Sequence, residues 1–142
     1  MRNFLIMFCI SLAFSACQKG PGEGGTSVIE GQVYKIFTFQ NPTTGLLDTT
    51  YFELDSGKDV FIIYSNDSLS VYDDKFETDF NGRYRFEFLR KGGYTLYTYA
   101  DSTEQITEEL SLKYPYPVFK KINVGSNNST IKVDDFIIQE NQ

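Results

Sequence analysis

The chain has 142 residues, with 19 acidic and 13 basic side chains and a formal net charge of −6. This length suits one domain, and an acidic chain without basic runs argues against nucleic-acid binding and against electrostatic docking on anionic lipid. The chain contains no histidine, which excludes a Ser-His-Asp triad, a Cys-His dyad and a histidine-ligated zinc site.

The first residues have the pattern of a secretion signal. Arg2 precedes an uncharged apolar run, 4–14, which is too short to span a bilayer because a span takes ~20 residues. The Ser15-Ala16-Cys17 that follows resembles the end of a bacterial lipoprotein signal, although Phe14 stands where that signal usually has leucine. We therefore expect a signal peptide over residues 1–16 and acylation of Cys17. The alternative is ordinary cleavage before Cys17, which would leave a free thiol.

A stretch rich in glycine and polar residues follows over residues 17–27. It lacks apolar periodicity, which predicts a flexible tether that holds the domain off the membrane. It also resembles the tails that follow the lipid cysteine in lipoproteins of Bacteroidota. This resemblance implies an outer-membrane protein of the cell envelope, periplasmic or surface-exposed, that contacts the membrane through its N-terminal lipid.

Short runs of β-branched and aromatic residues alternate with turn signals from residue 28 to the end. Such spacing predicts a single all-β sandwich domain over residues 28–142. We expect 51–54 to be an edge strand and 60–64 to be buried on both faces. The acid-rich segment 104–112 has the composition of a short helical turn. The predicted strands are 27–39, 51–54, 60–64, 74–80, 83–89, 94–100, 118–124 and 130–139.

The segment 76–99, FETDFNGRYRFEFLRKGGYTLYTY, predicts a three-strand meander with turns at Asn81-Gly82 and Gly92-Gly93. In its middle strand the apolar and charged residues alternate, so one set should face the core and the other set solvent. The expected core set is Tyr84, Phe86 and Phe88, and the expected outward set is Arg83, Arg85 and Glu87.

The same segment resembles the carboxypeptidase regulatory-like domains. The resemblance covers residues 28–138 and implies a transthyretin-like (prealbumin-like) sandwich of about seven strands, an accessory role without catalysis, and no particular ligand. The motifs that carry it are Gly31-Gln32-Val33, then Thr78 to Phe86 with Gly82 and Tyr84, then Leu89, then Gly93-Tyr94-Thr95-Leu96.

A calcium loop is a competing interpretation of this segment. Glu77, Asp79 and Asn81 followed by Gly82 resemble the start of such a loop, but its twelfth position, which needs a bidentate glutamate, is Phe88. We therefore predict no metal and no cofactor. Adjacent acids such as Glu108-Glu109 point to opposite faces of a strand, so a hydrolase that uses them is a minor hypothesis.

Tyrosines give the better indication of a binding surface. If Tyr94 and Leu96 face the core, Tyr97 and Tyr99 face outward, beside Arg83 and Arg85, where they suit a sugar or a protein partner. The alternative is cross-strand packing that stabilises the sheet without binding anything. A second candidate surface is Tyr114 and Tyr116, in a segment that we expect to be a proline-stiffened loop.

Three tripeptides resemble the O-glycosylation signal of exported Bacteroidota proteins, with acceptors Thr49, Ser68 and Ser102, all expected in loops. Taken together, the sequence favours a non-catalytic, lipid-anchored envelope protein whose sandwich is a structural or protein-interaction module. The alternative function is a surface lipoprotein that binds carbohydrate and assists glycan capture.

Overall fold

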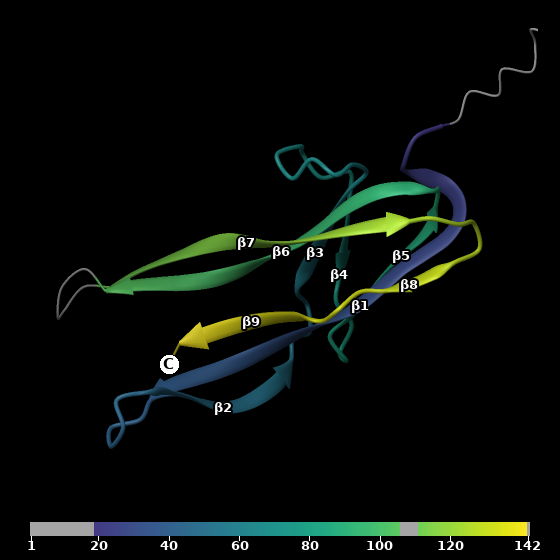
Figure 1. The fold of residues 1–142 in the computed structure, drawn as a ribbon. Helices are drawn as coiled ribbons and strands as arrows, with labels where there is room; N and C mark the ends of the chain where they lie inside the picture. Colours follow the sequence, from purple (N-terminus) through teal and green to yellow (C-terminus); the bar gives the residue numbers. More distant parts are fainter. Residues whose placement is uncertain (1–18, 106–110, 142) are drawn as a thin grey trace, which may run out of the picture.

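The computed structural model describes residues 19–105 and 111–141 of the chain. The described residues form two β-sheets that pack face to face as a sandwich (Figure 1), so the all-β sandwich is confirmed, with nine strands rather than about seven. The strands are β1 (Glu23–Gln40), β2 (Leu47–Leu54), β3 (Asp59–Ile63), β4 (Asp74–Glu77), β5 (Arg83–Leu89), β6 (Gly92–Gln105), β7 (Ser111–Val124), β8 (Thr130–Lys132) and β9 (Phe136–Asn141).

The long strand β1 organises the first sheet. Its first half pairs antiparallel with β5 and parallel with β8, and its second half pairs antiparallel with β2 and parallel with β9. Among the described strands β2 pairs with β1 alone, so the prediction of an edge strand at 51–54 is confirmed.

The second sheet has the order β4-β3-β6-β7. β3 lies between two neighbours and has Val60, Ile62 and Ile63 buried, whereas Phe61 and Tyr64 are half-buried. The prediction that 60–64 is buried on both faces is therefore confirmed only in part. β6 and β7 form a long antiparallel ladder that runs from Gly92–Val124 to Gln105–Ser111. The segment 104–112 therefore begins and ends as strand rather than as the expected helical turn, and residues 106–110, with the acids Glu108 and Glu109, lie outside the described residues.

The core fills the space between the two sheets. Burying side chains of this kind from water is the dominant stabilising contribution in such a fold. The core residues come from both layers, and they are Ile29, Val33, Val60, Ile62, Tyr84, Phe86, Leu89, Tyr94, Leu96, Ala100, Val124, Phe136 and Ile138.

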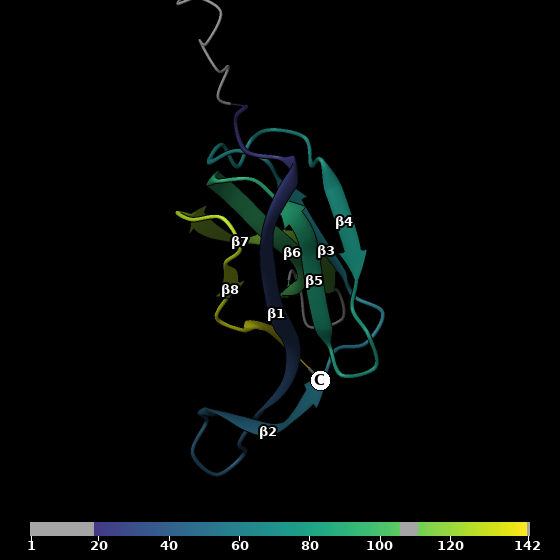
Figure 2. The same ribbon diagram turned by 90° about the vertical axis from the view of Figure 1, so that its right-hand side faces the viewer.

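The predicted meander over 76–99 is wrong. β4 and β6 both lie in the second sheet, whereas β5 between them pairs with β1 in the first, as Figure 2 shows. The turn itself is present: the Gly82 amide donates to the Asp79 carbonyl at 2.8 Å, and Gly82 has φ +65°. The chain uses this turn to cross from one sheet to the other, so its flanking strands do not pair.

Phe88 is not a core residue. Its side chain is 66 % exposed and its φ is +58°, while the next residue, Leu89, is buried. The register between β1 and β5 shifts here, from Ile29–Phe86 to Ser27–Leu89, so β5 carries one extra residue. Such a β-bulge reverses which face each following side chain occupies.

The N-terminal boundary of the domain also differs from the sequence prediction. β1 begins at Glu23, and Ser27 is fully buried, so residues 23–27 belong to the sandwich rather than to a tether. The Arg90 Nε donates to the Gly20 carbonyl at 2.8 Å, and the Arg90 amide donates to the Gly22 carbonyl at 2.9 Å. The glycines let this segment approach β5 closely, so the prediction of a flexible tether is wrong for residues 23–27.

Candidate functional site

The outer face of the second sheet carries a cluster of aromatic rings. Phe61 on β3 pairs with Tyr97 on β6, and Tyr97 pairs in turn with Phe119 on β7, so the three residues form one row across the strands. The Phe61 and Tyr97 rings stack with centroids 4.8 Å apart and planes 15° apart, and Phe119 lies 5.3 Å from Tyr97.

Two more rings complete this cluster. Tyr99 stands edge-on to both Phe61 and Tyr97, at 5.9 and 5.7 Å, and Tyr72, from the loop before β4, covers Phe61 at 4.9 Å. Tyr97 is almost covered by its neighbours, whereas Tyr72 and Tyr99 are 45 % and 40 % exposed. We name Phe61, Tyr72, Tyr97, Tyr99 and Phe119 the aromatic face.

The phenol hydroxyls of the aromatic face gather together. Burial raises the pKa of Tyr97, and the nearby hydroxyls of Tyr99 and Tyr72 raise it further, the former through a hydrogen bond. These hydroxyls can each donate and accept hydrogen bonds. The surface therefore combines exposed ring faces with a group of neutral donors and acceptors.

Sequence reasoning placed Tyr97 and Tyr99 on an outer face but missed their three partners. Phe61 lies inside an apolar run that reads as buried on both faces, so its outward position was hidden. Phe119 gave no usable signal, because Lys120 shares the phase of Val118 in the sequence, and only the pairing of β7 with β6 turns Phe119 outward. Nothing in the sequence around Tyr72 indicates that its ring packs on Phe61.

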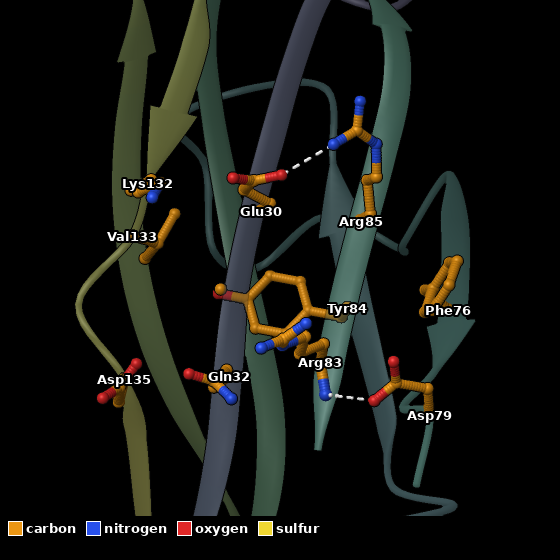
Figure 3. Close-up of a pocket in the computed structure, with 11 residues that line it drawn as sticks. Glu30, Gln32, Phe76, Asp79, Arg83, Tyr84, Arg85, Lys132, Val133 and Asp135 are labelled. Carbon is orange, nitrogen blue, oxygen red and sulfur yellow. Dashed lines mark hydrogen bonds and ion pairs between the residues drawn. The ribbon is translucent and has the colours of Figure 1, made fainter. Parts of the chain in front are cut away.

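Arg83 and Arg85 do not lie beside Tyr97 and Tyr99. They stand on β5, on the outer face of the other sheet, because β5 and β6 belong to different layers. There they line a shallow groove of about 610 Å³ with Glu30, Gln32 and residues of the β8–β9 segment, as Figure 3 shows. The predicted composite surface of tyrosines and arginines is therefore divided between two opposite faces.

Ion pairs occupy part of this groove. The Arg85 guanidinium donates to Glu87 Oε1 at 2.5 Å and to Glu30 Oε2 at 2.7 Å, and these partners raise its pKa, most strongly through the hydrogen bond that Glu87 accepts. Arg83 makes no ion pair with any residue in the described ranges. Asp79, next to it, accepts hydrogen bonds from the amides of Asn81 and Arg83 at 2.8 and 2.9 Å, so this carboxylate shapes the turn.

Tyr84 lies under this groove, in the core. Its ring crosses behind β1 in Figure 3, beneath Gly31, where a Cβ would lie 2.4 Å from the hydroxyl oxygen. The hydroxyl is buried and has no hydrogen-bond partner within the described part of the chain. Burial raises the pKa of Tyr84 far above its ordinary value, and the charge of Asp135 adds to the effect.

Tyr114 and Tyr116 lie on β7 and not in a loop. They pair with Ser102 and Ala100 of β6, and Pro115 and Pro117 are part of the same strand. Each tyrosine is 41 % exposed, on the sheet face opposite to Phe119. They therefore form a separate surface from the aromatic face.

The predicted modification sites are split by the structure. Thr49 lies in β2 and Ser102 in β6, so these two acceptors are in strands rather than loops, whereas Ser68 is in the loop between β3 and β4. Cys17 lies outside the described residues.

Within the described ranges there is no group of three or more acidic or cysteine side chains that could hold a metal ion, and no helix long and apolar enough to cross a membrane.

Comparison with known proteins gives a likeness of fold. No protein-family model and no curated protein sequence matches the chain. Among solved structures, the chain is similar to a candidate carbohydrate-binding protein of Pseudomonas aeruginosa, with 16% sequence identity and a TM-score of 0.49 over 84% of this chain and 92% of that chain. A likeness at this level concerns architecture and does not identify what this chain binds.

Proposed function

We propose that the protein is a non-catalytic, lipid-anchored module of the bacterial cell envelope whose aromatic face binds carbohydrate. The observation that carries the proposal is that the exposed rings of Tyr72 and Tyr99 meet the phenol hydroxyl of the largely buried Tyr97. Sugars present both apolar C–H faces and hydroxyls, so a surface with ring faces and neutral donors complements them.

The composition of the aromatic face favours a sugar over an apolar protein partner. Deep apolar pockets that anchor a protein side chain are typical of protein–protein hot spots. Here the rings lie on a sheet surface and pack on one another. Tyr99 and Tyr72 stand at the exposed positions. Their packing fixes the rings before a ligand arrives, which lowers the entropy cost of binding.

The envelope location and the absence of catalysis rest on the sequence. The lipoprotein-like signal ending in Cys17 supports anchoring by acyl chains, and the resemblance to carboxypeptidase regulatory-like domains supports an accessory role. Metabolic labelling with radioactive palmitate tests the anchor: label should enter the wild-type protein and be lost in Cys17→Ala, which should leave the membrane fraction. Unlabelled protein, or a membrane-bound Cys17→Ala, would contradict acylation.

The aromatic face is tested on a glycan array, followed by calorimetry with the best-binding glycan. Tyr99→Ala and Tyr72→Ala should each weaken binding by at least tenfold, which is about 1.4 kcal/mol. Phe52→Ala is the matched control, because Phe52 is an exposed aromatic on β2 in the other sheet. Equal affinity of Tyr99→Ala and wild type, or equal loss in Phe52→Ala, would refute the assignment.

A further inference from the structure

The folded domain begins closer to Cys17, the predicted site of the lipid, than the sequence indicates. Arg90 holds Gly20 and Gly22 through two hydrogen bonds, at 2.8 and 2.9 Å, and also bonds the Glu23 carbonyl. Cys17 is three residues before Gly20, and three residues span at most ~11 Å when extended. An acylated Cys17 would therefore place this end of the sandwich directly at the bilayer surface.

The loop between β3 and β4, residues 64–73, lies at this same end. The Tyr64 hydroxyl donates to Glu23 Oε1 at 3.3 Å, and the Asn66 amide packs where a Cβ on Gly93 would be, 2.2 Å away. Both views place this loop at the top of the molecule, as they do the N-terminal segment, and far from the β1–β2 hairpin (Figures 1 and 2).

The tip of this loop presents two aliphatic side chains to solvent. Leu69 is 93 % exposed and Val71 is 83 % exposed. The loop has a defined shape, because Asp67 accepts hydrogen bonds from the Leu69 amide at 3.0 Å and the Ser70 hydroxyl at 3.1 Å. Exposed apolar side chains are ordinary on a protein surface. What distinguishes Leu69 and Val71 is that they lie on an ordered loop that contacts the N-terminal segment.

Cationic side chains accompany the loop at this end. Lys19, Arg90 and Lys91 line a shallow hollow beside Gly24 and Gly25. Lys19 and Lys91 are exposed and make no ion pair with a described residue. Acidic side chains lie at this end too: Glu23, Asp73 and Asp74 act on Tyr64, and Asp67 lies in the loop. Docking therefore depends on the acyl chains and the two aliphatic side chains, and not on an excess of positive charge.

We propose that this end of the sandwich docks on the lipid bilayer, with Leu69 and Val71 inserted between the headgroups and Lys19 and Lys91 beside lipid phosphates. The inference rests on the proposed acylation of Cys17, which brings the loop within reach of the membrane. Docking would fix the direction in which the domain stands, with the β1–β2 hairpin pointing away from the bilayer. The short segment after Cys17 would then hold the domain against the bilayer instead of keeping it at a distance.

Site-specific fluorescence on the acylated protein tests the docking. The full chain carrying Leu69→Cys, Val71→Cys or Leu46→Cys is purified from bacterial membranes, labelled with a polarity-sensitive dye and reconstituted in liposomes of phosphatidylethanolamine and phosphatidylglycerol. Leu46 is the matched control, a leucine that is 67 % exposed on the β1–β2 hairpin. The dye at 69 and 71 should emit at least twofold more strongly than at 46, and lipids with spin labels near the headgroup should quench it.

The outcomes separate the docking from the anchor. Acylated protein whose dyes at 69 and 71 behave like the dye at 46 would overturn the docking and leave the anchor intact. Protein whose intact mass shows no acyl chain would overturn both. Strong emission that spin-labelled lipid fails to quench, and that grows with the protein-to-lipid ratio, would assign the loop to contacts between copies of the chain and overturn membrane insertion.

Discussion

Two tyrosines of the core, Tyr84 and Tyr94, differ in what their hydroxyls do. Both rings are buried, one on each side of the turn that joins β5 to β6. The Tyr94 hydroxyl donates to the Arg90 carbonyl at 2.7 Å and accepts from the Gly22 amide at 2.9 Å. The Tyr84 hydroxyl has no partner among the described residues.

The difference shows how two parts of one core are specified. Around Tyr94, hydrogen bonds and close backbone approaches join the N-terminal segment to the β5–β6 turn. Around Tyr84, packing of rings decides the structure: Phe136 lies 6.0 Å away and Phe86 lies 6.2 Å away. We expect substitutions near Tyr94 to act through polar contacts, and substitutions at Tyr84 to act through shape.

The largest effect should follow from Gly25→Ala, in the N-terminal segment whose Gly22 is bonded to Tyr94. A Cβ at this position would lie 2.0 Å from the Leu89 carbonyl oxygen, a backbone atom that cannot turn aside. We expect the free energy of unfolding in urea to fall by about 3 kcal/mol.

Gly125→Ala is the control, because a Cβ there meets nothing within 4 Å and the change should stay within about 0.5 kcal/mol. If Gly25→Ala is as stable as Gly125→Ala, the N-terminal segment is a flexible tether after all, as its sequence suggests.

A smaller effect should follow from Tyr94→Phe. The ring is kept, but the buried Gly22 amide loses its acceptor, and an unsatisfied buried group costs about 1–3 kcal/mol. Urea unfolding should show a loss of about 1–2 kcal/mol, and amide exchange of Gly22 should become faster. Tyr116→Phe, on an exposed ring, should change neither quantity, and unaltered exchange at Gly22 in Tyr94→Phe would contradict the role of the hydroxyl.

The smallest effect should follow from Tyr84→Phe. Since the hydroxyl has no partner, its removal leaves no group unsatisfied, and the free energy of unfolding at pH 7 should stay within about 0.5 kcal/mol or rise slightly. A loss as large as that of Tyr94→Phe would show that the Tyr84 hydroxyl is bonded, and would remove the contrast between the two tyrosines.

Alkaline pH should sharpen the same contrast. Burial, and secondarily Asp135, raises the pKa of Tyr84 above its unfolded value of about 10. The stabilisation tied to the neutral phenol is therefore present below pH ~10 and is lost as pH rises through the folded pKa. Unfolding curves should show that Tyr84→Phe loses less stability above pH 10 than wild type does.

The alternation of apolar and polar residues correctly predicted which side chains face the core along regular strands. It failed where the backbone departs from a regular strand. Tyr84 and Phe86 are buried as expected, but the extra residue in β5 sends Phe88 outward and Leu89 inward. A rule based on strict alternation cannot predict where a bulge inserts an extra residue. Nothing in the sequence indicates that Phe88 adopts a positive φ. The turn at Asn81-Gly82 was identified correctly, yet the same residues serve a hairpin and a crossing between sheets equally well.

The candidate surfaces were predicted in part for the same reason. Alternation along β6 correctly predicts that Tyr97 and Tyr99 point away from the core, because this orientation depends on the sequence of β6 alone. Their neighbours depend on which strands pair, which is decided by contacts distant in the chain. The sequence therefore assigned Arg83 and Arg85 to the wrong layer and missed Phe61, Tyr72 and Phe119.

The prolines in β7 affect whether the sheet edges of two molecules can pair with each other. Pro115 and Pro117 sit opposite Asp101 and Tyr99 within a continuous ladder, so their nitrogens take the positions that point away from β6, towards the open edge of the sheet. Proline has no N–H, so a foreign strand that arrived there would find two successive donors missing. Molecules crowded on a surface would thus be protected from joining edge to edge into fibrils along this part of the strand.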